Sequence, residues 1–168
     1  KARPFRKLAA KTPAALADRC DFLVTCVTNA GALESVLFGK GGIVDTSSKS
    51  LVVIDCSTIL PSQSANCAER LRASGIEMLG SPVMGGPAAA ASGGLVPIVA
   101  GKKKVFSKTL RVLETMGKPV FYAGQKDGSA NAIKLALNLN IALIAGALSE
   151  AITLVRSYGA EPELFLKV

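Results

Sequence analysis

One lysine in an otherwise apolar stretch is the residue of this sequence best suited to chemistry. Lys134 lies near the start of a proline-free run, Ser129 to Tyr158, that is dense in Ala, Leu, Ile and Asn. Asn131 and Asn138 stand three residues before it and four after it, so on a helix they share its face. Burial lowers the pKa of a lysine toward the range in which it exchanges protons near neutral pH. The alternative is a lysine that reaches solvent from near a helix end, and the two asparagines favour the functional interpretation.

Hydroxyl side chains follow the second expected strand, in the stretch Asp55-Cys56-Ser57-Thr58-Ile59-Leu60-Pro61. Ligands of open α/β sheets bind beyond the carboxyl ends of the strands, so Ser57 and Thr58 would face that crevice. Either side chain could instead cap the helix that follows, and the stretch taken alone favours capping.

Paired glycines occur in the stretch Ser81 to Pro87, after the third expected strand. Gly85 and Gly86 have no Cβ, so their backbone amides can approach a ligand carboxylate closely. A plain wide turn explains the same pair equally well.

The elements that must position these residues are indicated by short apolar, β-branched runs that alternate with helical ones between Asp21 and Gly101. Such alternation is typical of βα units around a largely parallel sheet. The expected strands are Phe22–Val27, Leu51–Asp55, Glu77–Leu79, Leu95–Ala100 and Pro119–Tyr122. The expected helices are Pro13–Arg19, Ala32–Leu37, Pro61–Ser74 and Lys103–Met116, with Gly75 and Gly117 as stop signals.

The run from Ser129 to Tyr158 has a different character from everything before it. It predicts a helix of roughly 45 Å, which exceeds what one small domain needs. Because it is apolar on all sides, we expect a second domain or a second subunit to bury it, which makes a homo-oligomer the expected state. We therefore divide the chain into an open α/β domain, residues 1–127, and an interdomain helix that begins an all-α domain, residues 128–168.

Charge and hydropathy exclude some partners. The net charge of +8 comes largely from residues 1–11 and from Lys102-Lys103-Lys104, but only 5% of residues are aromatic, which disfavours nucleic acid as a partner. The stretch Ala132–Leu148 has the hydropathy of a membrane span, but it is short for the hydrocarbon core and holds Lys134, Asn138 and Asn140. We therefore expect no membrane partner.

Cysteine usage bounds the compartment and the metals. The four cysteines form no C-x-x-C pair, and the sequence has no histidine, so a structural zinc site is excluded. Cysteines inside apolar strands behave as small hydrophobes, so we expect reduced thiols and a cytoplasmic protein, with the mitochondrial matrix as the eukaryotic alternative.

Taken in order, the three stretches resemble the β-hydroxyacid dehydrogenase family, which includes 3-hydroxyisobutyrate dehydrogenases and tartronate semialdehyde and glyoxylate reductases. The family motifs D-x-S-T-x-x-P, P-V-x-G-G and G-x-x-x-x-x-K-x-x-x-N correspond to Asp55–Pro61, Pro82–Gly86 and Gly128–Asn138. A G-x-L-x-x-x-V-x-G strand, Gly93–Gly101, follows the second motif as it does in the family. The resemblance implies an incomplete Rossmann-type sheet followed by the interdomain helix.

The same resemblance implies a role for each site residue. Lys134 would be the general acid/base at the substrate hydroxyl, and the substrate is a small β-hydroxy acid or its semialdehyde. Asn138 and Ser57 would help to hold this substrate. Gly85 and Gly86 would bind the carboxylate of the substrate. Thr58 would contact the nicotinamide ribose of NAD or NADP, and Val27 and Thr28 would line the cofactor cleft.

The sequence departs from the family pattern in one side chain and in extent. Met84 stands where the family usually has Ser or Thr, which removes a hydroxyl beside the carboxylate site. No G-x-G-x-x-G occurs, and by resemblance the sequence opens after the second strand of the family and stops about halfway along its helical domain. We expect a fragment that is inactive by itself.

Two other functions fit the same fold. An imine reductase is the nearest, but members of that group typically lack a lysine at the position of Lys134. A non-catalytic scaffold that associates with nucleic acid is the alternative from a different class, and it would use the basic clusters.

Overall fold

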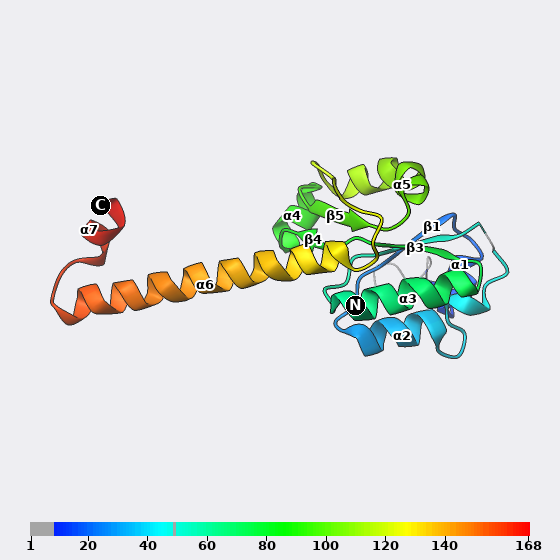
Figure 1. The fold of residues 1–168 in the computed structure, drawn as a ribbon, viewed down its shortest axis with the longest axis horizontal. Coiled ribbons are helices and arrows are strands. Elements are labelled where there is room, and N and C mark those ends of the chain that lie inside the picture. The colour runs from blue at the N-terminus through cyan, green and yellow to red at the C-terminus, as the bar shows by residue number, and fades with distance from the viewer. Residues whose placement is uncertain (1–8, 49) are drawn as a thin grey trace. The chain divides into compact units, whose positions relative to one another are not determined.

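The computed structural model describes residues 9–48 and 50–168, so most of the basic segment 1–11 lies outside the described residues. Two compact units follow one another along the chain, Lys1–Lys134 and Leu135–Val168. The first is a sheet with helices on both faces, and it holds almost all of the expected strands and helices (Figure 1).

The sheet of the first unit is parallel in one half and antiparallel at its centre. Strands β1 (Phe22–Thr25), β2 (Val52–Asp55) and β3 (Glu77–Gly80) run parallel, but β5 (Val96–Ala100) is antiparallel to β3. Strand β6 (Phe121–Gly124) runs parallel to β5, and the two-residue β4 (Val83–Met84) pairs antiparallel with it. The expectation of a largely parallel sheet is confirmed, and the exceptions are the single β3–β5 register pair and the two-residue β4. A parallel return from β3 usually runs through a crossover helix, whereas here the segment before β5 forms β4 and the six-residue α4.

Every helix expected from the sequence is present, with ends shifted by a few residues. The helices are α1 (Pro13–Ala17), α2 (Ala30–Phe38), α3 (Pro61–Ala73), α5 (Lys103–Met116) and α6 (Ser129–Ser157). Helix α2 begins two residues before the expected start because the Asn29 side chain accepts a hydrogen bond from the Ala32 amide at 2.9 Å. Four short elements were not expected: β4, α4 (Pro87–Ser92), α7 (Pro162–Lys167) and a 3-10 turn, η2 (Ile43–Asp45).

The core lies on both faces of the sheet, and β2 is its centre. All four residues of β2 are buried, and successive side chains enter opposite clusters. Val53 packs with Leu33 and Leu71 beneath α2 and α3. Ile54 packs with Leu113 of α5 on the other face. A central strand enclosed in this way fixes where its carboxyl end lies, and Asp55 is its last residue.

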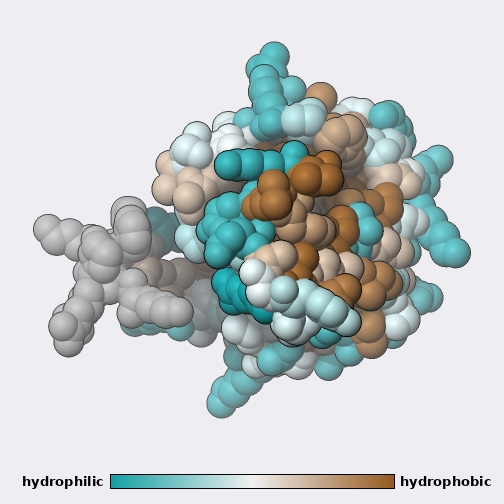
Figure 2. Space-filling model, turned by 90° about the vertical axis from the view of Figure 1, so that its left-hand side faces the viewer, coloured by the Kyte–Doolittle hydropathy of each residue, from teal (hydrophilic) through white to brown (hydrophobic). Residues whose placement is uncertain are grey.

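The second unit, Leu135–Val168, consists of α6 from Leu135 onward and of α7. Many of its apolar side chains are exposed. Leu139, Leu143 and Ile144 are each more than 60% exposed. Hydrophobic side chains also lie among hydrophilic ones on the face of the molecule shown in Figure 2. By length and composition alone α6 could span a bilayer. Its polar side chains Asn138 and Asn140 still favour burial against protein, which remains a prediction.

Candidate functional site

A buried polar cluster lies at the carboxyl ends of β1 and β2. The Asp55 side chain is fully buried, and its Oδ1 accepts hydrogen bonds from Thr25 Oγ1 at 2.8 Å and from Ser57 Oγ at 2.7 Å. Burial raises the pKa of the Asp55 carboxyl, and the hydrogen bonds from Ser57 and Thr25 oppose that shift. The sequence reasoning missed Asp55 and Thr25 as site residues. An acidic residue that closes a fully apolar strand was the available signal.

Ser57 connects this carboxyl to the loop after β1. Its hydroxyl donates to Asp55 and accepts a hydrogen bond from the Val27 amide at 3.0 Å. Only 1% of Ser57 is exposed, so its hydroxyl is engaged inside the protein. The capping alternative is wrong for both hydroxyls, because α3 begins at Pro61 with Leu60 at its N-cap position. Thr58 is exposed beside Ser57, and Thr28 is exposed beside Val27.

The start of α6 is fastened to the loop that carries Ser57. The Asn131 amide group donates to the backbone carbonyls of Ser57 and Ile59, at 3.4 Å in each case. Gly128 has a φ of +84°, and a Cβ at this position would lie 2.4 Å from the Pro61 carbonyl oxygen. Only glycine allows so close an approach with this backbone conformation. The glycine of the third motif is therefore required where α6 meets α3.

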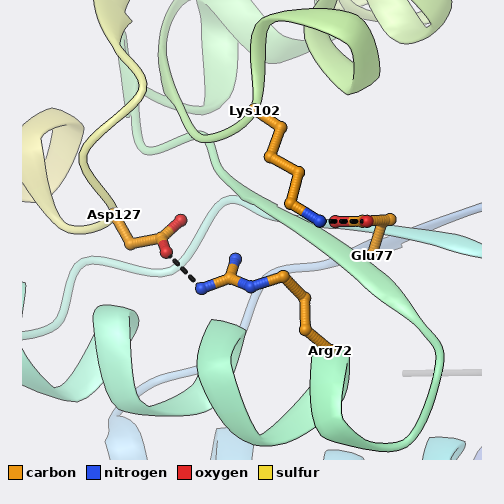
Figure 3. Close-up of polar contacts among 4 residues, drawn as sticks. All are labelled: Arg72, Glu77, Lys102 and Asp127. Carbon is orange, nitrogen blue, oxygen red and sulfur yellow. Dashed lines mark hydrogen bonds and ion pairs between the residues drawn. The ribbon is translucent and has the colours of Figure 1, made fainter.

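An ion pair holds the segment just before α6. The Arg72 guanidinium, from the last turn of α3, lies 2.5 Å from the Asp127 carboxylate (Figure 3). Both side chains are largely shielded from solvent, and the hydrogen bond to Asp127 raises the pKa of Arg72. This contact and the Gly128 approach together determine where α6 begins.

Lys134 reaches the short strand β4. Its Nζ lies 3.1 Å from the Met84 sulfur, and the side chain is half-buried rather than extended into solvent. Burial lowers the pKa of Lys134, and none of the ion pairs among the described residues involves it. A thioether is a weak acceptor and carries no charge, so it does not hold the proton on the amine as a carboxylate would. Within residues 9–48 and 50–168, Lys134 therefore has no counter-ion, and it lies next to the glycine loop.

The paired glycines differ in what they permit. Gly85 has a φ of +115°, and a Cβ there would meet Ala89 and Leu95 at about 3 Å. Gly86 has open space where a side chain would be, and both glycines are exposed. Gly85 thus forms the turn, while Gly86 leaves its backbone accessible to a ligand. Met84, which contacts Lys134, directly precedes the two glycines, so Lys134 lies at the start of the glycine loop.

The structure brings the predicted residues together in two groups. Ser57, Val27, Thr28 and Thr58 form one, at the ends of β1 and β2; Lys134 and the glycines after Met84 form the other. Asn131, which contacts Ser57 and lies one helical turn before Lys134, connects them. Asn138 belongs to the second unit and is exposed. Exposed hydroxyls and backbone beyond the carboxyl ends of two parallel strands lie where open α/β sheets bind their ligands.

Comparison with known proteins identifies the family of the chain. Residues 4–124 match the family model described as the NAD binding domain of 6-phosphogluconate dehydrogenase. The chain is 31% identical over 153 residues to the 2-(hydroxymethyl)glutarate dehydrogenase of Eubacterium barkeri, an alignment that covers 91% of this chain and 50% of that protein. It spans about half the length of the curated relatives it matches.

Solved structures share the fold over most of the chain. The 3-hydroxyisobutyrate dehydrogenase of Salmonella typhimurium superposes with a TM-score of 0.78 at 28% identity, covering 90% of this chain and 53% of that one. An imine reductase from Myxococcus stipitatus superposes with a TM-score of 0.89 over 99% of this chain and 59% of that one. At 20% identity the second likeness shows the fold alone.

Proposed function

Because this chain belongs to the β-hydroxyacid dehydrogenase family, with residues 4–124 matching an NAD binding domain, we propose that it is part of an enzyme that oxidises a small β-hydroxy acid or reduces its semialdehyde. One observation carries the proposal beyond the family. Lys134 is half-buried, forms no ion pair among the described residues and contacts Met84, the residue directly before the paired glycines. A lysine in that setting can release and regain a proton.

NAD or NADP, when bound, would accept the hydride from the β-carbon or return it. The residues of this chain would hold the nicotinamide end. Thr58 and the backbone of Val27–Thr28 are the exposed groups beyond β2 and β1, and they would contact the ribose region. Ser57 holds the backbone of Val27 in place, because its hydroxyl oxygen accepts a hydrogen bond from the Val27 amide.

Lys134 would move the proton. In the oxidation direction its neutral amine accepts the proton of the substrate hydroxyl as the carbonyl forms, and in reduction the ammonium returns it. The lowered pKa of Lys134 favours the neutral amine at a given pH, so activity in the oxidation direction should rise as pH rises through that pKa.

The substrate would be held by its carboxylate. The open backbone at Gly86 and the turn at Gly85 offer amides to an anion, and Asn138 would hold the substrate from the same helix as Lys134. Relatives named for 3-hydroxyisobutyrate, 2-(hydroxymethyl)glutarate and L-threonate support a small hydroxy acid as the substrate. We also propose that the protein is cytoplasmic and forms a homo-oligomer in which a second subunit covers α6.

The test is a turnover assay on the protein that carries this chain. It is purified and mixed with NAD⁺ or NADP⁺ and, in turn, 3-hydroxyisobutyrate, 2-(hydroxymethyl)glutarate and a cyclic amine, and reduced cofactor is followed by absorbance. The proposal predicts reduction with at least one hydroxy acid. Turnover of the cyclic amine alone would instead assign an imine reductase, and salt-sensitive binding of DNA without turnover would assign the scaffold.

A further inference from the structure

The carboxyl of Asp55 has no step in the proposed reaction, yet it is the one charged side chain fully buried in the described part of the chain. A single oxygen, Oδ1, takes three hydrogen bonds, from Thr25 Oγ1, from Ser57 Oγ and from the Ser57 amide at 3.3 Å. A buried carboxyl is costly unless its partners repay the lost hydration. Neutral packing would fill the same space at less cost, so the geometry calls for a role.

The direction of the hydrogen bonds indicates that role. A serine hydroxyl has one hydrogen, and here it points to Asp55. The oxygen of Ser57 therefore presents its lone pairs to the Val27 amide at 3.0 Å. If Asp55 were absent, the hydroxyl could rotate, and its hydrogen would compete with that of the Val27 amide. Asp55 thus sets the orientation of the group that holds the loop after β1.

The same serine also receives the helix that carries Lys134. Asn131 donates to the Ser57 carbonyl, and it lies three residues before Lys134. A Cβ on Gly80, the register partner of Asp55 on β3, would lie 3.1 Å from Asn131 Oδ1. The absence of a side chain at Gly80 leaves the room that Asn131 occupies. Ser57 is therefore bonded from three sides, by β2, by the β1 loop and by α6.

We propose that Asp55 is a positioning residue which, through Ser57, holds the Val27–Thr28 loop of the cofactor cleft in a fixed place relative to the start of α6. The identity of that cleft rests on the proposed function. The contacts themselves do not, because all of them lie within the first unit. The alternative is that Asp55 and Ser57 only stabilise the fold.

Hydrogen exchange at the Val27 amide distinguishes these readings without any turnover. Ser57→Ala removes the acceptor, so the exchange of Val27 should quicken by about tenfold or more, while Val53 and Ile54 in β2 stay protected. Asp55→Ala should have the same selective effect, and Asp55→Asn should restore protection because the amide oxygen still accepts from Ser57. Ser81→Ala is the matched control. It removes a fully buried serine hydroxyl, unpaired in the described residues, at the end of the neighbouring β3.

Each result of the exchange experiment either supports or overturns the positioning role. Selective exchange at Val27 in the Ser57 and Asp55 alanine variants, with Ser81→Ala unchanged, supports positioning. Unchanged Val27 exchange in Ser57→Ala or in a folded Asp55→Ala, or a parallel rise at Val27, Val53 and Ile54, overturns it. The Ser57 variant carries this decision even if Asp55→Ala does not fold.

A kinetic measurement tests whether the contacts of Asp55 and Ser57 affect cofactor binding. Where the protein turns over a hydroxy acid, Ser57→Ala should raise KM for NAD(P) by about tenfold and change kcat much less, since the reacting groups are untouched. An unchanged KM for NAD(P) in that variant would overturn the link to the cleft. A wild-type protein without dehydrogenase activity would refute the proposed function but leave the exchange result standing.

Discussion

The two ends of the sheet in the first unit treat polar groups in opposite ways. At the carboxyl ends of β1 and β2, Thr25, Asp55 and Ser57 are at most 5% exposed, and the hydroxyls of Thr25 and Ser57 donate to Asp55 at 2.8 and 2.7 Å. At the amino end of β3, Lys102 and Glu77 form an ion pair at 2.6 Å in which Lys102 is half exposed (Figure 3). Lys104 and Lys108 line a shallow pocket at the same end.

The difference shows which polar groups constrain the chain. An exposed ion pair competes with water and contributes little, so its partners can move or be replaced. A buried hydroxyl or carboxyl has no such competitor, and each must keep its partner or lose free energy. Charge is abundant at the amino end, but fixed geometry is found at the carboxyl end, where we place the chemistry.

The largest expected effect is on catalysis by Lys134. In the active protein, Lys134→Ala should lower kcat by about 10² to 10⁴, the range for loss of a positioned acid or base, with KM for NAD(P) nearly unchanged. Lys104→Ala, which removes a lysine from the opposite end, is the control and should leave kcat as it is. Steady-state kinetics gives kcat for both variants, and an equal loss of kcat in the two would contradict the role proposed for Lys134.

The next effect is on stability, at the glycine where α6 meets α3. Gly128→Ala forces a side chain into a positive φ and against the Pro61 carbonyl, so it should lower the free energy of unfolding by more than about 1 kcal/mol. Gly146→Ala on the same helix meets nothing within 4 Å and should leave stability unchanged or raise it by up to about 1 kcal/mol. Urea unfolding of the two variants measures the difference. A Gly128 variant as stable as wild type would show that α6 is not held there.

Met84 should affect substrate binding more than chemistry. Met84→Ser would place a hydroxyl beside the glycine loop and remove the thioether from Lys134, so KM for a hydroxy acid should fall by about tenfold, the scale of one hydrogen bond to a charged group. Met84→Leu, which is similar in volume and has no acceptor, separates the gain of the hydroxyl from the loss of sulfur. A fall in KM with both variants would assign the effect to space alone.

The smallest effect expected is a change in how stability depends on pH. The pKa of Asp55 is raised above the ordinary 3.8, so the folded state binds more protons than the unfolded one between those two values. Stability should therefore fall as pH rises through that window, and Asp55→Asn should remove this fall. Urea unfolding at several pH values tests it. A wild-type stability that rises across the window, as for a carboxylate with a lowered pKa, would contradict the assigned burial effect.

Much of the fold could be predicted because its signals are local. Apolar runs closed by turn residues located β1, β2 and β3, and the long helix α6 was predicted within one residue of its observed end. The antiparallel direction of β5 could not be predicted, because it depends on how the short segment after β3 packs. Elements of two to six residues, such as β4 and α4, carry too little periodicity to be recognised.

The sequence indicates candidate site residues but not the contacts between them. The order of motifs singled out Lys134, Ser57 and the glycines, yet spacing alone does not show that Lys134 meets Met84. Nor does it show that Asp55 and Asn131 both bond to Ser57, since these residues are far apart in the chain and meet only through the packing of α3 and α6. Roles that depend on such long-range contacts need coordinates.

The kcat of Lys134→Arg, compared with wild type and with Lys134→Ala, tests the central claim most directly. Guanidinium keeps the positive charge but does not give up its proton near neutral pH, so it separates proton transfer from anchoring of a carboxylate. The account predicts that Lys134→Arg loses nearly as much activity as Lys134→Ala. If Lys134→Arg kept most of the wild-type kcat, Lys134 would be an anchor for the substrate, and the proton-transfer role proposed for it would be wrong.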